Sequence, residues 1–460
     1  MDGLAKEVCK RLPLAEAILR MMRFVCDEDF LADVFERNRG RSYQRNLSFA
    51  LMVQLIADAL IRHGGSGRKS FESAEEADML PTTIRAVYRK LARLPLSLST
   101  ALLRESTVRL RELFPDTKRN WRVPESLRSF EVVVHDGKKI KHVAKRLGAL
   151  REVLGQIMGG KLVVSQSLNS GLALIVSADR DGESADQPLV PSALAQLRAV
   201  VTTTMLHVAD RMFCDLVQIT LFRKAGDHFL LRWHTKVQFR RDDHWETLVG
   251  TDRYGRTYEE DWGWVGGPSD KRRCYVRRIR LKRDDGDDVI LLTDLTDQEA
   301  FPADDLLEVY LSRWGIEMMF QKVTQVFHLK NLIGSTPEAT IFQASFCFLI
   351  YNMIEVMRCW LADGQEMEPG EVSMAKLFED VREELIAWNK MLDLKSTLSL
   401  MESTWTGPQV KRRLEQTLHG HWSKRWKKAP SNTHVNPPPE RKYIKGGHSS
   451  VARLAKKHKP

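Results

Sequence analysis

The sequence predicts an α/β protein in which an α/β region with a β-rich insertion lies between two helical regions. Residues 1 to about 115 hold helical patterns of apolar residues and no convincing strand. From Phe130 onward, short runs rich in β-branched and aliphatic residues are separated by Gly, Asn and Ser turns. After Pro302 helical patterns return and continue to about residue 410.

A chain of 460 residues is long enough for more than one domain, or for one core with a large insertion. Its apolar content of 43% is ordinary for a globular protein, so a sizeable core can be buried. We expect four regions: a helical domain at 1–120, an α/β domain at 121–345 with a β-rich insertion at 211–300, a helical region at 346–425, and a basic disordered tail at 426–460.

The clearest N-terminal helix is expected over residues 82–94, after the acidic helix ESAEEADML and a short turn. Its apolar stripe leaves Arg85 and Arg89 on other faces. Two helices arranged in this way could form a helix-turn-helix whose arginines contact DNA. A plain helical bundle with solvated arginines explains the segment equally well, and both interpretations stay open.

The central sheet is expected to form from the runs SFEVVVHD, LVVSQSL, LALIVSAD and TTMLHVAD. Fully apolar runs such as 132–134 suit strands that are covered on both faces. In the insertion, Trp233, Thr235, Val237 and Phe239 alternate with polar residues and predict a half-exposed antiparallel strand. YVRRIRL and DVILLTDL flank a DDGDD turn and predict a hairpin.

The long apolar run from Ile341 predicts a buried helix that begins at Thr336 and Pro337. A membrane span would rarely tolerate its four polar residues, so we expect no membrane partner. The six cysteines form no CxxC pair, and several lie in apolar stretches. This pattern favours buried, reduced thiols and a reducing cytosol.

The net charge of +11 belongs to the C-terminus. The residues from Lys411 to Pro460 include 14 Lys and Arg but only two acids, whereas the rest of the chain is nearly neutral. Such a tail is either a polyanion-binding arm or a solvated, disordered end. The composition favours the arm, because nucleic acid is the commonest polyanionic partner.

Three acidic residues have unusual surroundings. Asp136 and Asp210 each end an apolar run, and Glu317 lies in YLSRWGIE. On a single helix, Tyr310, Arg313 and Glu317 would share one face, because they are three and four residues apart. The three carboxylates could hold a pair of Mg²⁺ ions, and Arg313 could bind a phosphate. An isolated Asp after a strand is more often a turn or cap residue, so the combination is what carries this interpretation.

These motifs resemble the DDE transposases of the insertion-sequence-four type, which have a ribonuclease-H-like catalytic core. The resemblance covers roughly residues 132–357 and rests on VVHDGKK, HVADRMF, ILLTDL, YLSRWGIEMMF and NLIGSTPE. It implies that Asp136, Asp210 and Glu317 are the catalytic residues and ligate two Mg²⁺ ions, for which Mn²⁺ could substitute. It also implies that Tyr310 and Arg313 contact DNA phosphate near the scissile bond.

One position departs from the family motif, which has a Lys seven residues after the Glu. That position is Thr324 here. Lys322 lies five residues after Glu317, about 140° around a helix, so it does not replace the lysine on the same face. From the missing lysine we expect weaker binding to the transposon end or lower activity, with another basic residue, such as Lys138 or Lys139, compensating. A decayed, inactive copy is an alternative, against which the survival of all three acids argues.

The family often stacks an extruded base on an aromatic residue of the insertion. Trp233, Trp245, Trp262 and Trp264 are candidates, although β-sheet packing is the more usual role for any one of them. Trp262 and Trp264 are preferred, because the glycines in WGWVGG suggest an exposed loop. Trp314 is expected to pack its helix into the core.

The resemblance therefore predicts a DNA transposase. DNA binding by the N-terminal helical domain is expected separately, from the possible helix-turn-helix with Arg85 and Arg89. The partners of such a transposase would be double-stranded transposon ends and target DNA, with a homodimer in the synaptic complex, and it would act in the cytoplasm at the nucleoid. A metal-dependent nuclease or resolvase of the same fold remains an alternative. A non-catalytic DNA-binding repressor derived from a transposase is another, and it would need none of the three acids.

Overall fold

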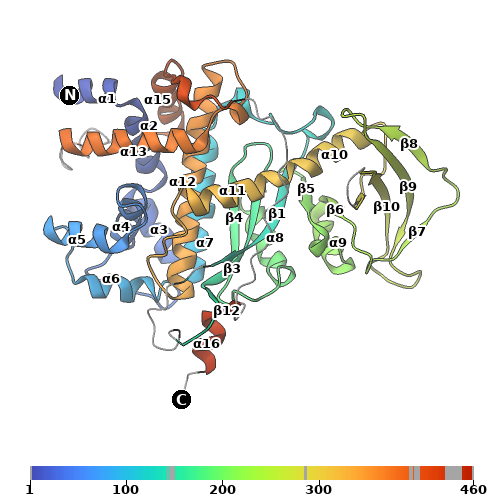
Figure 1. Ribbon diagram of the computed structural model, residues 1–460, viewed down its shortest axis with the longest axis horizontal. Coiled ribbons are helices and arrows are strands. Elements are labelled where there is room, and N and C mark those ends of the chain that lie inside the picture. Colours follow the sequence, from blue (N-terminus) through green and yellow to red (C-terminus); the bar gives the residue numbers. More distant parts are fainter. Residues whose placement is uncertain are drawn as a thin grey trace.

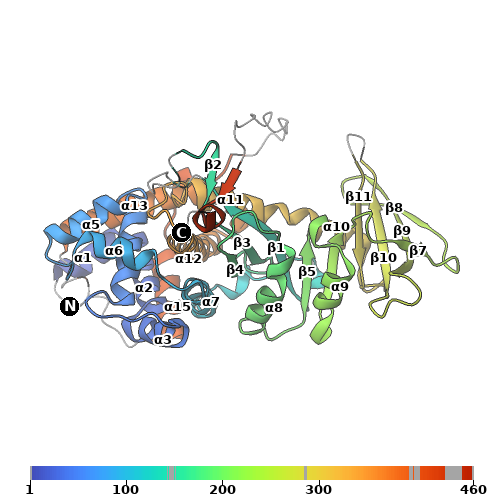
Figure 2. The same cartoon turned by 90° about the horizontal axis from the view of Figure 1, so that it is seen from below.

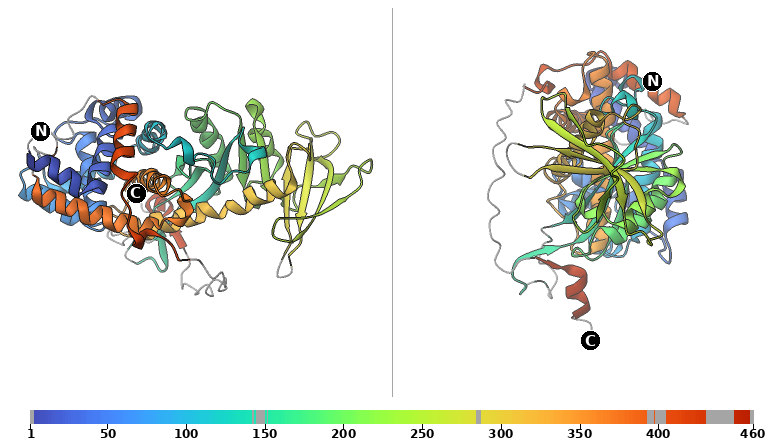
Figure 3. Two further views of the ribbon diagram at one scale, coloured as in Figure 1. Left: turned by 90° about the horizontal axis from the view of Figure 1, so that it is seen from above. Right: turned by 90° about the vertical axis from the view of Figure 1, so that its right-hand side faces the viewer.

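The computed structural model describes residues 3–141, 143, 150, 152–283, 287–392, 397, 405–429 and 448–457. Helices gather at one end of the molecule and a large mixed sheet extends to the other (Figure 1). The α/β class and the helical regions on either side of the sheet in sequence are as predicted. The view along the long axis of the molecule shows a strongly twisted sheet (Figure 3, right). Sheets of L-residues twist in this way.

The N-terminal region is entirely helical over the residues described. Side chains of Asp27, Ser48 and Thr83 cap three of its helices by accepting hydrogen bonds from backbone N–H groups. The helix expected at 82–94 is shorter at both ends and runs from Ile84 to Leu91. It begins later than expected because Thr83 is its N-cap. The helices are α1 (Gly3–Arg11), α2 (Pro13–Val25), α3 (Glu28–Asn38), α4 (Phe49–Ile61), α5 (Gly67–Glu76), α6 (Ile84–Leu91) and α7 (Leu96–Glu112).

The central sheet begins with three antiparallel strands and continues with two strands parallel to the first. Their spatial order is β4-β3-β1-β5-β6, and Figure 2 shows β1 and β5 side by side. The bounds are β1 (Glu131–Ile140), β3 (Gly160–Ser167), β4 (Ala173–Asp179), β5 (Met205–Ala209) and β6 (His228–Arg232).

Both faces of this sheet are covered, as the apolar runs predicted. Val133 packs with α8 (Val190–Arg198) in one cluster, whereas Val132 and Val134 belong to the core on the opposite face. Because side chains alternate along a strand, every second residue of β1 and β5 faces α8 and α9 (Leu216–Phe222). The residues between them face the long C-terminal helices.

The insertion extends the same sheet. Strand β11 (Val289–Thr293) pairs with β6, and the sheet continues through β10 (Cys274–Leu281) to β9 (Thr257–Val265), which pairs with the short strands β7 (Phe239–Arg241) and β8 (Leu248–Thr251). The predicted hairpin is confirmed as β10–β11. The strand predicted from Trp233 to Phe239 is wrong: the backbone turns there, and Val237 N–H donates to His234 C=O at 2.9 Å.

Two consecutive helices, α10 (Ala303–Ser312) and α11 (Trp314–Gln325), run from the insertion across the sheet toward the helical end (Figure 1). Beyond them come α12 (Pro337–Asp363), α13 (Met374–Met391) and α15 (Gly407–Leu418), which share one core with the N-terminal helices. As predicted, Thr336 caps α12 and Pro337 begins it. Among the described helices, α12 alone is long and apolar enough to cross a membrane, and that window is entirely buried inside the protein. All six cysteines are free, and five are buried.

The prediction of a disordered tail at 426–460 is wrong for part of this segment. Strand β12 (His448–Ser450) pairs in parallel with β2 (Gln156–Met158), and α16 (Val451–Lys457) follows it. Arg453 pairs with Asp181 at 2.7 Å, so basic side chains of the tail find acids on the core. Residues 430–447 lie outside the described part of the chain.

Candidate active site

Strand register brings Asp136 and Asp210 together. His135 of β1 is paired with Ala209 of the parallel strand β5, so the next residue on each strand is one of the two acids. Both acids also lie on the same face of the sheet, because they alternate with His135 and Ala209. That face is the one covered by α11.

Asp136 ends its apolar run but does not close its strand, whereas Asp210 directly follows the end of β5. β1 continues to Ile140 through pairing with β3, whereas β5 ends at Ala209. Gly137 follows Asp136 because a larger residue would not fit: an added Cβ would lie 2.1 Å from Oδ1 of Asp186. Asp186 is itself neutralised by the buried Lys161, whose Nζ lies 2.6 Å from the same oxygen.

Glu317 completes the group through Arg313. The guanidinium of Arg313 lies 3.3 Å from Oε1 of Glu317 and 3.9 Å from Oδ2 of Asp136. The single helix predicted for this motif is instead two, which meet at Arg313. There Arg313 N–H bonds to Tyr310 C=O and Ile316 N–H bonds to Arg313 C=O, both three residues apart. The backbone stays helical at Arg313, so its side chain still turns toward both acids.

The carboxylates influence one another electrically. Burial raises the pKa of Asp136 to about 6, and the negative charges of Asp210 and Glu317 add to the rise. The Gly137 N–H, which donates to Oδ1 of Asp136 at 2.8 Å, and the Arg313 charge oppose it. A bound cation would offset the repulsion between these three carboxylates and favour the ionised form of Asp136. A set of oxygen donors alone suits a hard ion such as Mg²⁺.

Arg313 supplies the counter-charge in the arrangement described. Of the side chains that the structure describes, no three His, Cys, Asp or Glu groups stand close enough to hold one ion without moving. A cation bound by these acids would supply the positive charge that Arg313 now supplies to Asp136 and Glu317. Nε of Arg313 is buried and has no hydrogen-bond partner among the described residues, so only part of the guanidinium is held by hydrogen bonds.

The remaining residues of the Tyr-Arg-Glu motif differ in exposure. Tyr310 is buried, with 5% of its surface exposed, so its contact with phosphate stays a prediction. Trp314, predicted to pack into the core, is 59% exposed as the first residue of α11, and that prediction is wrong. The hydroxyl of Thr324 donates to Phe320 C=O at 2.7 Å and is thus used within the helix.

The lysines expected to replace the family lysine lie in different surroundings. Lys138 is half-buried, with Nζ 4.9 Å from the ring centre of Phe320 and 3.5 Å from its carbonyl oxygen. Burial lowers the pKa of Lys138 to about 8. Lys139 is exposed on the opposite face of the strand. Their roles in DNA binding stay predictions.

The exposed loop predicted for WGWVGG is wrong at both tryptophans. Trp262 and Trp264 lie in β9, where Trp262 is buried and its indole N–H donates to Thr296 C=O at 2.9 Å. Trp264 is half-buried beneath the guanidinium of Arg273. The glycines of this motif serve close strand packing, since a Cβ on Gly263 would lie 2.2 Å from Arg240 C=O. Base stacking on either residue stays a prediction.

A basic groove of about 830 Å³ lies beside α6 in the N-terminal helical region. Arg85 and Arg89 are both exposed on α6, and Arg89 lines the groove. The exposed Tyr43 also lines it, together with further basic residues: Arg41, Arg45, Lys90, Arg93 and Arg180. Arg180 is paired with Glu338 at 2.7 Å, the one acid among the lining residues. The helix-turn-helix interpretation stays untested, but this surface has the charge that a polyanion requires.

Sequence reasoning missed a chain of polar side chains behind the acids, here called the histidine chain: the buried Ser165, His135, His207 and Asp227, and the exposed Arg198 that pairs with Asp227. His207 Nε2–H donates to the Asp227 carboxylate at 3.2 Å, so Nδ1 of His207 accepts from His135 Nε2–H at 2.9 Å. His135 Nδ1 then accepts from the Ser165 hydroxyl at 3.0 Å. Burial lowers the pKa of His135 to about 3, so it is neutral.

The histidine chain joins β3, β1 and β5 by side chains as well as by backbone. Phe222 of α9 stacks on both imidazole rings. His135 immediately precedes Asp136, so this chain fixes the strand that carries the first acid. Its only trace in the sequence is a histidine inside each of two apolar runs, VVVHD and MLHVAD.

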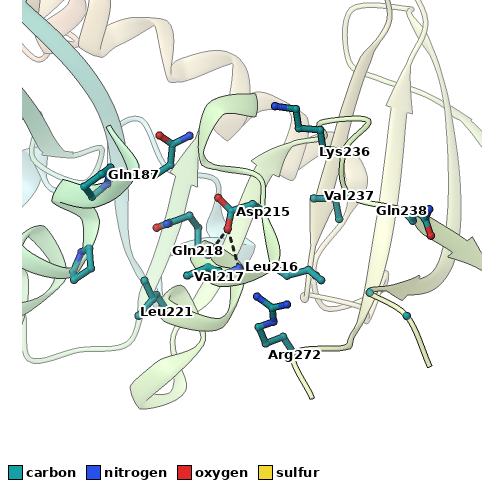
Figure 4. Close-up of a pocket in the computed structure, with 14 residues that line it drawn as sticks. Gln187, Asp215, Leu216, Val217, Gln218, Leu221, Lys236, Val237, Gln238 and Arg272 are labelled. Atoms are coloured by element: carbon teal, nitrogen blue, oxygen red, sulfur yellow. Dashed lines mark hydrogen bonds between the residues drawn. The ribbon is translucent and has the colours of Figure 1, made fainter. Parts of the chain in front are cut away.

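A separate pocket of about 720 Å³ lies between α9 and the insertion and contains none of the three acids (Figure 4). Its one carboxylate, Asp215, accepts hydrogen bonds from the N–H groups of Val217 and Gln218 at 2.8 and 2.9 Å. Because this carboxylate caps α9, the pocket offers no free acid for catalysis.

Comparison with known proteins connects this site to transposases. Residues 127–353, which include all three acids, match the family model described as "Transposase DDE domain". Domains of that description depend on divalent metal ions. Among curated proteins, a probable transposase for insertion sequence element IS5377 from Geobacillus stearothermophilus is 24% identical over 34% of this chain. The putative transposase y4zB of Sinorhizobium fredii (strain NBRC 101917 / NGR234) is 30% identical over 18% of this chain and 22% of its own length.

The matched portions are limited in extent. This chain spans 39% of the length of the Geobacillus relative. Among solved structures, a cryo-EM structure of a piggyBac transposase synaptic complex with hairpin DNA overlays on 90% of this chain and 85% of its own. The TM-score is 0.34 at 11% identity, too low to bear on fold or function.

Proposed function

We propose that this protein is a DNA transposase that cleaves the ends of a mobile element and joins them to target DNA. The observation that carries the proposal is the convergence of Asp136, Asp210 and Glu317 around Arg313 within a span that matches a transposase DDE domain. The transposase relatives support the same activity.

The finer family assignment is part of the proposal. In an insertion-sequence-four transposase with a ribonuclease-H-like core, the first Asp closes the first core strand and the second closes the fourth. Here Asp210 follows β5, the fourth strand of the central sheet, whereas Asp136 lies within the first strand, β1, which continues to Ile140. The β-rich insertion precedes Glu317, as in that family. Strand order and motif order therefore support this assignment together.

Each residue of the site has a chemical task in this proposal. Asp136, Asp210 and Glu317 would hold two Mg²⁺ ions, for which Mn²⁺ could substitute. When bound, such ions neutralise charge on the attacking and leaving oxygens of a phosphodiester. Arg313 would leave the acids and make paired hydrogen bonds to a phosphate of the cleaved strand. The first attack, by water, frees a 3′-hydroxyl, and the second attack, by that hydroxyl, joins it to target DNA.

The proposed partner is double-stranded DNA, both transposon ends and target. The groove beside α6 and the basic C-terminal residues support this, because both concentrate positive charge. Joining two ends requires them to be held together, so we propose a homodimer in the synaptic complex. We also propose that the protein acts in the cytoplasm at the nucleoid, where the chromosome and reduced cysteines would be found together.

Strand transfer in Mg²⁺ tests the proposal. The assay uses an element-end duplex, a plasmid target and the full chain, and compares wild type with Asp136→Asn. The variant should lose at least roughly a thousandfold in cleavage and joining, because the first carboxylate is gone. Asp243→Asn, an exposed acid of the insertion, is the matched control and should keep full activity.

Two results would overturn the proposal. Cleavage without joining by the wild type would make the protein a nuclease or resolvase. DNA binding with neither reaction, unchanged in Asp136→Asn, would make it a repressor.

A further inference from the structure

Four basic side chains from separate segments surround one buried carboxylate on the flank of α11. The group, here called the cationic cluster, consists of Arg122, Lys322, Arg358 and Lys428 around Glu355. Four bases face a single acid, so the set is short of negative charge. Unmatched positive charge is costly to bury, and it is a reason to look for an anion that completes it.

The floor of the cluster belongs to α12. Glu355 and Arg358 are fully buried one turn apart and form an ion pair. This pair leaves hydrogen-bonding capacity unused on both sides: Nε of Arg358 and Oε2 of Glu355 are buried and have no partner among the residues described. The indole Nε1 of Trp121, next to the cluster, is likewise buried without an acceptor in the described chain.

Three further segments of the chain form the outer edge, or rim, of the cluster. The guanidinium of Arg122 lies 3.9 Å from Glu355 and 4.1 Å above the ring of Trp121. Trp121 packs against Gly370, and Lys428 donates a hydrogen bond to the carbonyl oxygen of that glycine. Lys428 is exposed, so the rim reaches solvent.

Lys322 enters the same cluster from α11. It is half-buried, and its charge is repelled by Arg358, Lys428 and Arg122. Burial lowers the pKa of Lys322 to about 7, and these repulsions contribute. No ion-pair or hydrogen-bond partner is recorded for its Nζ among the described side chains. Gly315, seven residues earlier on the same face of α11, lies beside Arg122, since an added Cβ would be 3.7 Å from Nη1, an ordinary van der Waals distance.

The cluster and the catalytic acids lie on opposite flanks of one exposed ridge. At about 100° per residue, Trp314, Met318 and Gln321 share the outward face of α11, and all three are exposed. Glu317 lies on one side of this ridge and Lys322 on the other. The two are about 7.5 Å apart along the helix axis, at 1.5 Å per residue. A DNA backbone that crosses the ridge at the acids would therefore pass the rim of the cluster.

We propose that the cationic cluster binds a phosphate group of the DNA backbone beside the cleavage site. This inference rests on the proposed function, which brings DNA across α11. A phosphate has acceptor oxygens for Lys322, Lys428 and Arg122, and its negative charge offsets the surplus of bases. The cluster thereby supplies the attraction that Thr324 lacks, from a different flank of the helix and not from Lys138 or Lys139.

The test is DNA binding by the full chain without divalent metal, so that cleavage plays no part. Fluorescence anisotropy with a short duplex of arbitrary sequence is measured over a range of NaCl concentrations. Lys322→Met should lower affinity roughly tenfold at low salt and reduce the slope of log K against log salt by about 1. Lys428→Met, an exposed position where folding is not at risk, should act in the same direction.

The matched control is Lys390→Met, an exposed lysine of α13 that makes the same change in net charge. It should leave the slope unchanged. Thermal melting in sodium phosphate and in sodium chloride at equal ionic strength provides a second arm. Phosphate should raise the melting temperature of wild type more than that of Lys322→Met, which itself should not melt earlier than wild type.

The results separate three failures. If wild type binds DNA and Lys322→Met and Lys428→Met keep its slope, the inference is overturned while the proposed transposase stands. If phosphate stabilises wild type selectively but the DNA slopes are equal, the site takes free phosphate, and the assignment to DNA is overturned. If wild type binds no DNA, the proposed function fails together with the inference.

Discussion

The histidine chain and the cationic cluster are both buried polar groups beside the proposed catalytic site, yet they are built in opposite ways. In the histidine chain each donor meets one acceptor, and the single charged pair of Arg198 and Asp227 is balanced. In the cationic cluster four bases share Glu355, and Arg358 keeps an unused donor.

This contrast separates structural polarity from binding capacity. A buried network that satisfies itself needs nothing from outside and serves to fix strands, because removing any member leaves another unpaired. A network with surplus charge is incomplete, and it gains free energy when an anion arrives. The histidine chain should therefore respond to mutation through stability alone. The cationic cluster should respond through ligand binding.

The largest expected effect is from Asp227→Ala. The Asp227 carboxylate accepts from Met205 N–H at 2.8 Å and from His207, and it pairs with Arg198. Its loss should lower the free energy of unfolding by about 3–5 kcal/mol, as measured in urea, because the buried Met205 N–H and His207 lose their acceptor and Arg198 loses its ion-pair partner. Added phosphate should not restore it. Asp243→Ala, at an exposed position, should change stability by less than about 0.5 kcal/mol.

Glu355→Gln should destabilise less, by about 1–3 kcal/mol, because the rim of the cationic cluster reaches water. Part of the loss should return in phosphate buffer, since an anion from solution can replace the missing charge. The same urea titrations in phosphate and in chloride measure both effects. A loss that phosphate leaves unaltered would mean that the cluster is as self-contained as the histidine chain.

Lys322→Met should raise the free energy of unfolding by about 1 kcal/mol at neutral pH, because it removes a crowded cation. The gain should depend on pH. The folded pKa of Lys322 is lowered to about 7 from 10.5 by burial and by Arg358, Lys428 and Arg122, against the attraction of Glu355. Between pH 7 and 10.5 the unfolded chain holds a proton that the folded one lacks, so wild-type stability rises with pH.

The difference between Lys322→Met and wild type should accordingly be greatest at pH 7 and below, and should shrink toward pH 10. Urea titrations at several pH values measure it. A difference that stays constant across this window would show that Lys322 is not held in the cluster as a crowded cation.

The smallest expected effect is from Thr324→Lys, which restores the family lysine. In the wild type it should raise DNA affinity by less than about threefold, because the cationic cluster already supplies an attraction nearby. In the Lys322→Met background the gain should be larger. Anisotropy titrations of the four proteins give the coupling, and additive effects would show that the two positions act on different phosphates.

The sequence was most informative where chemistry and local pattern coincide. The hairpin β10–β11, the cap at Thr336 and the buried apolar helix follow from turn residues and periodicity, which act locally. The sequence placed Asp136 and Asp210 at the ends of two apolar runs, and the parallel register of β1 and β5 brings them together, although β1 continues past Asp136. Predicting their meeting required no knowledge of the backbone beyond two parallel strands.

Where tertiary contacts decide, sequence patterns misled. Trp233 to Phe239 alternate like a strand, but Trp233 Nε1–H donates to Val237 C=O and closes a turn. Trp314 is apolar yet exposed, because it lies with Met318 and Gln321 on the outward face of α11. The cationic cluster draws its members from residues more than 300 positions apart, so no window of sequence could show it.

The pairing of β6 with β11 has a consequence for how the molecule can move. Since backbone hydrogen bonds run without interruption from the first core strand into the insertion, no flexible hinge separates the two. The insertion cannot swing over bound DNA like a separate arm on a swivel. Any closure that it makes must spread as a change of twist through the shared strands, and would reach Asp136 and Asp210 along the same backbone.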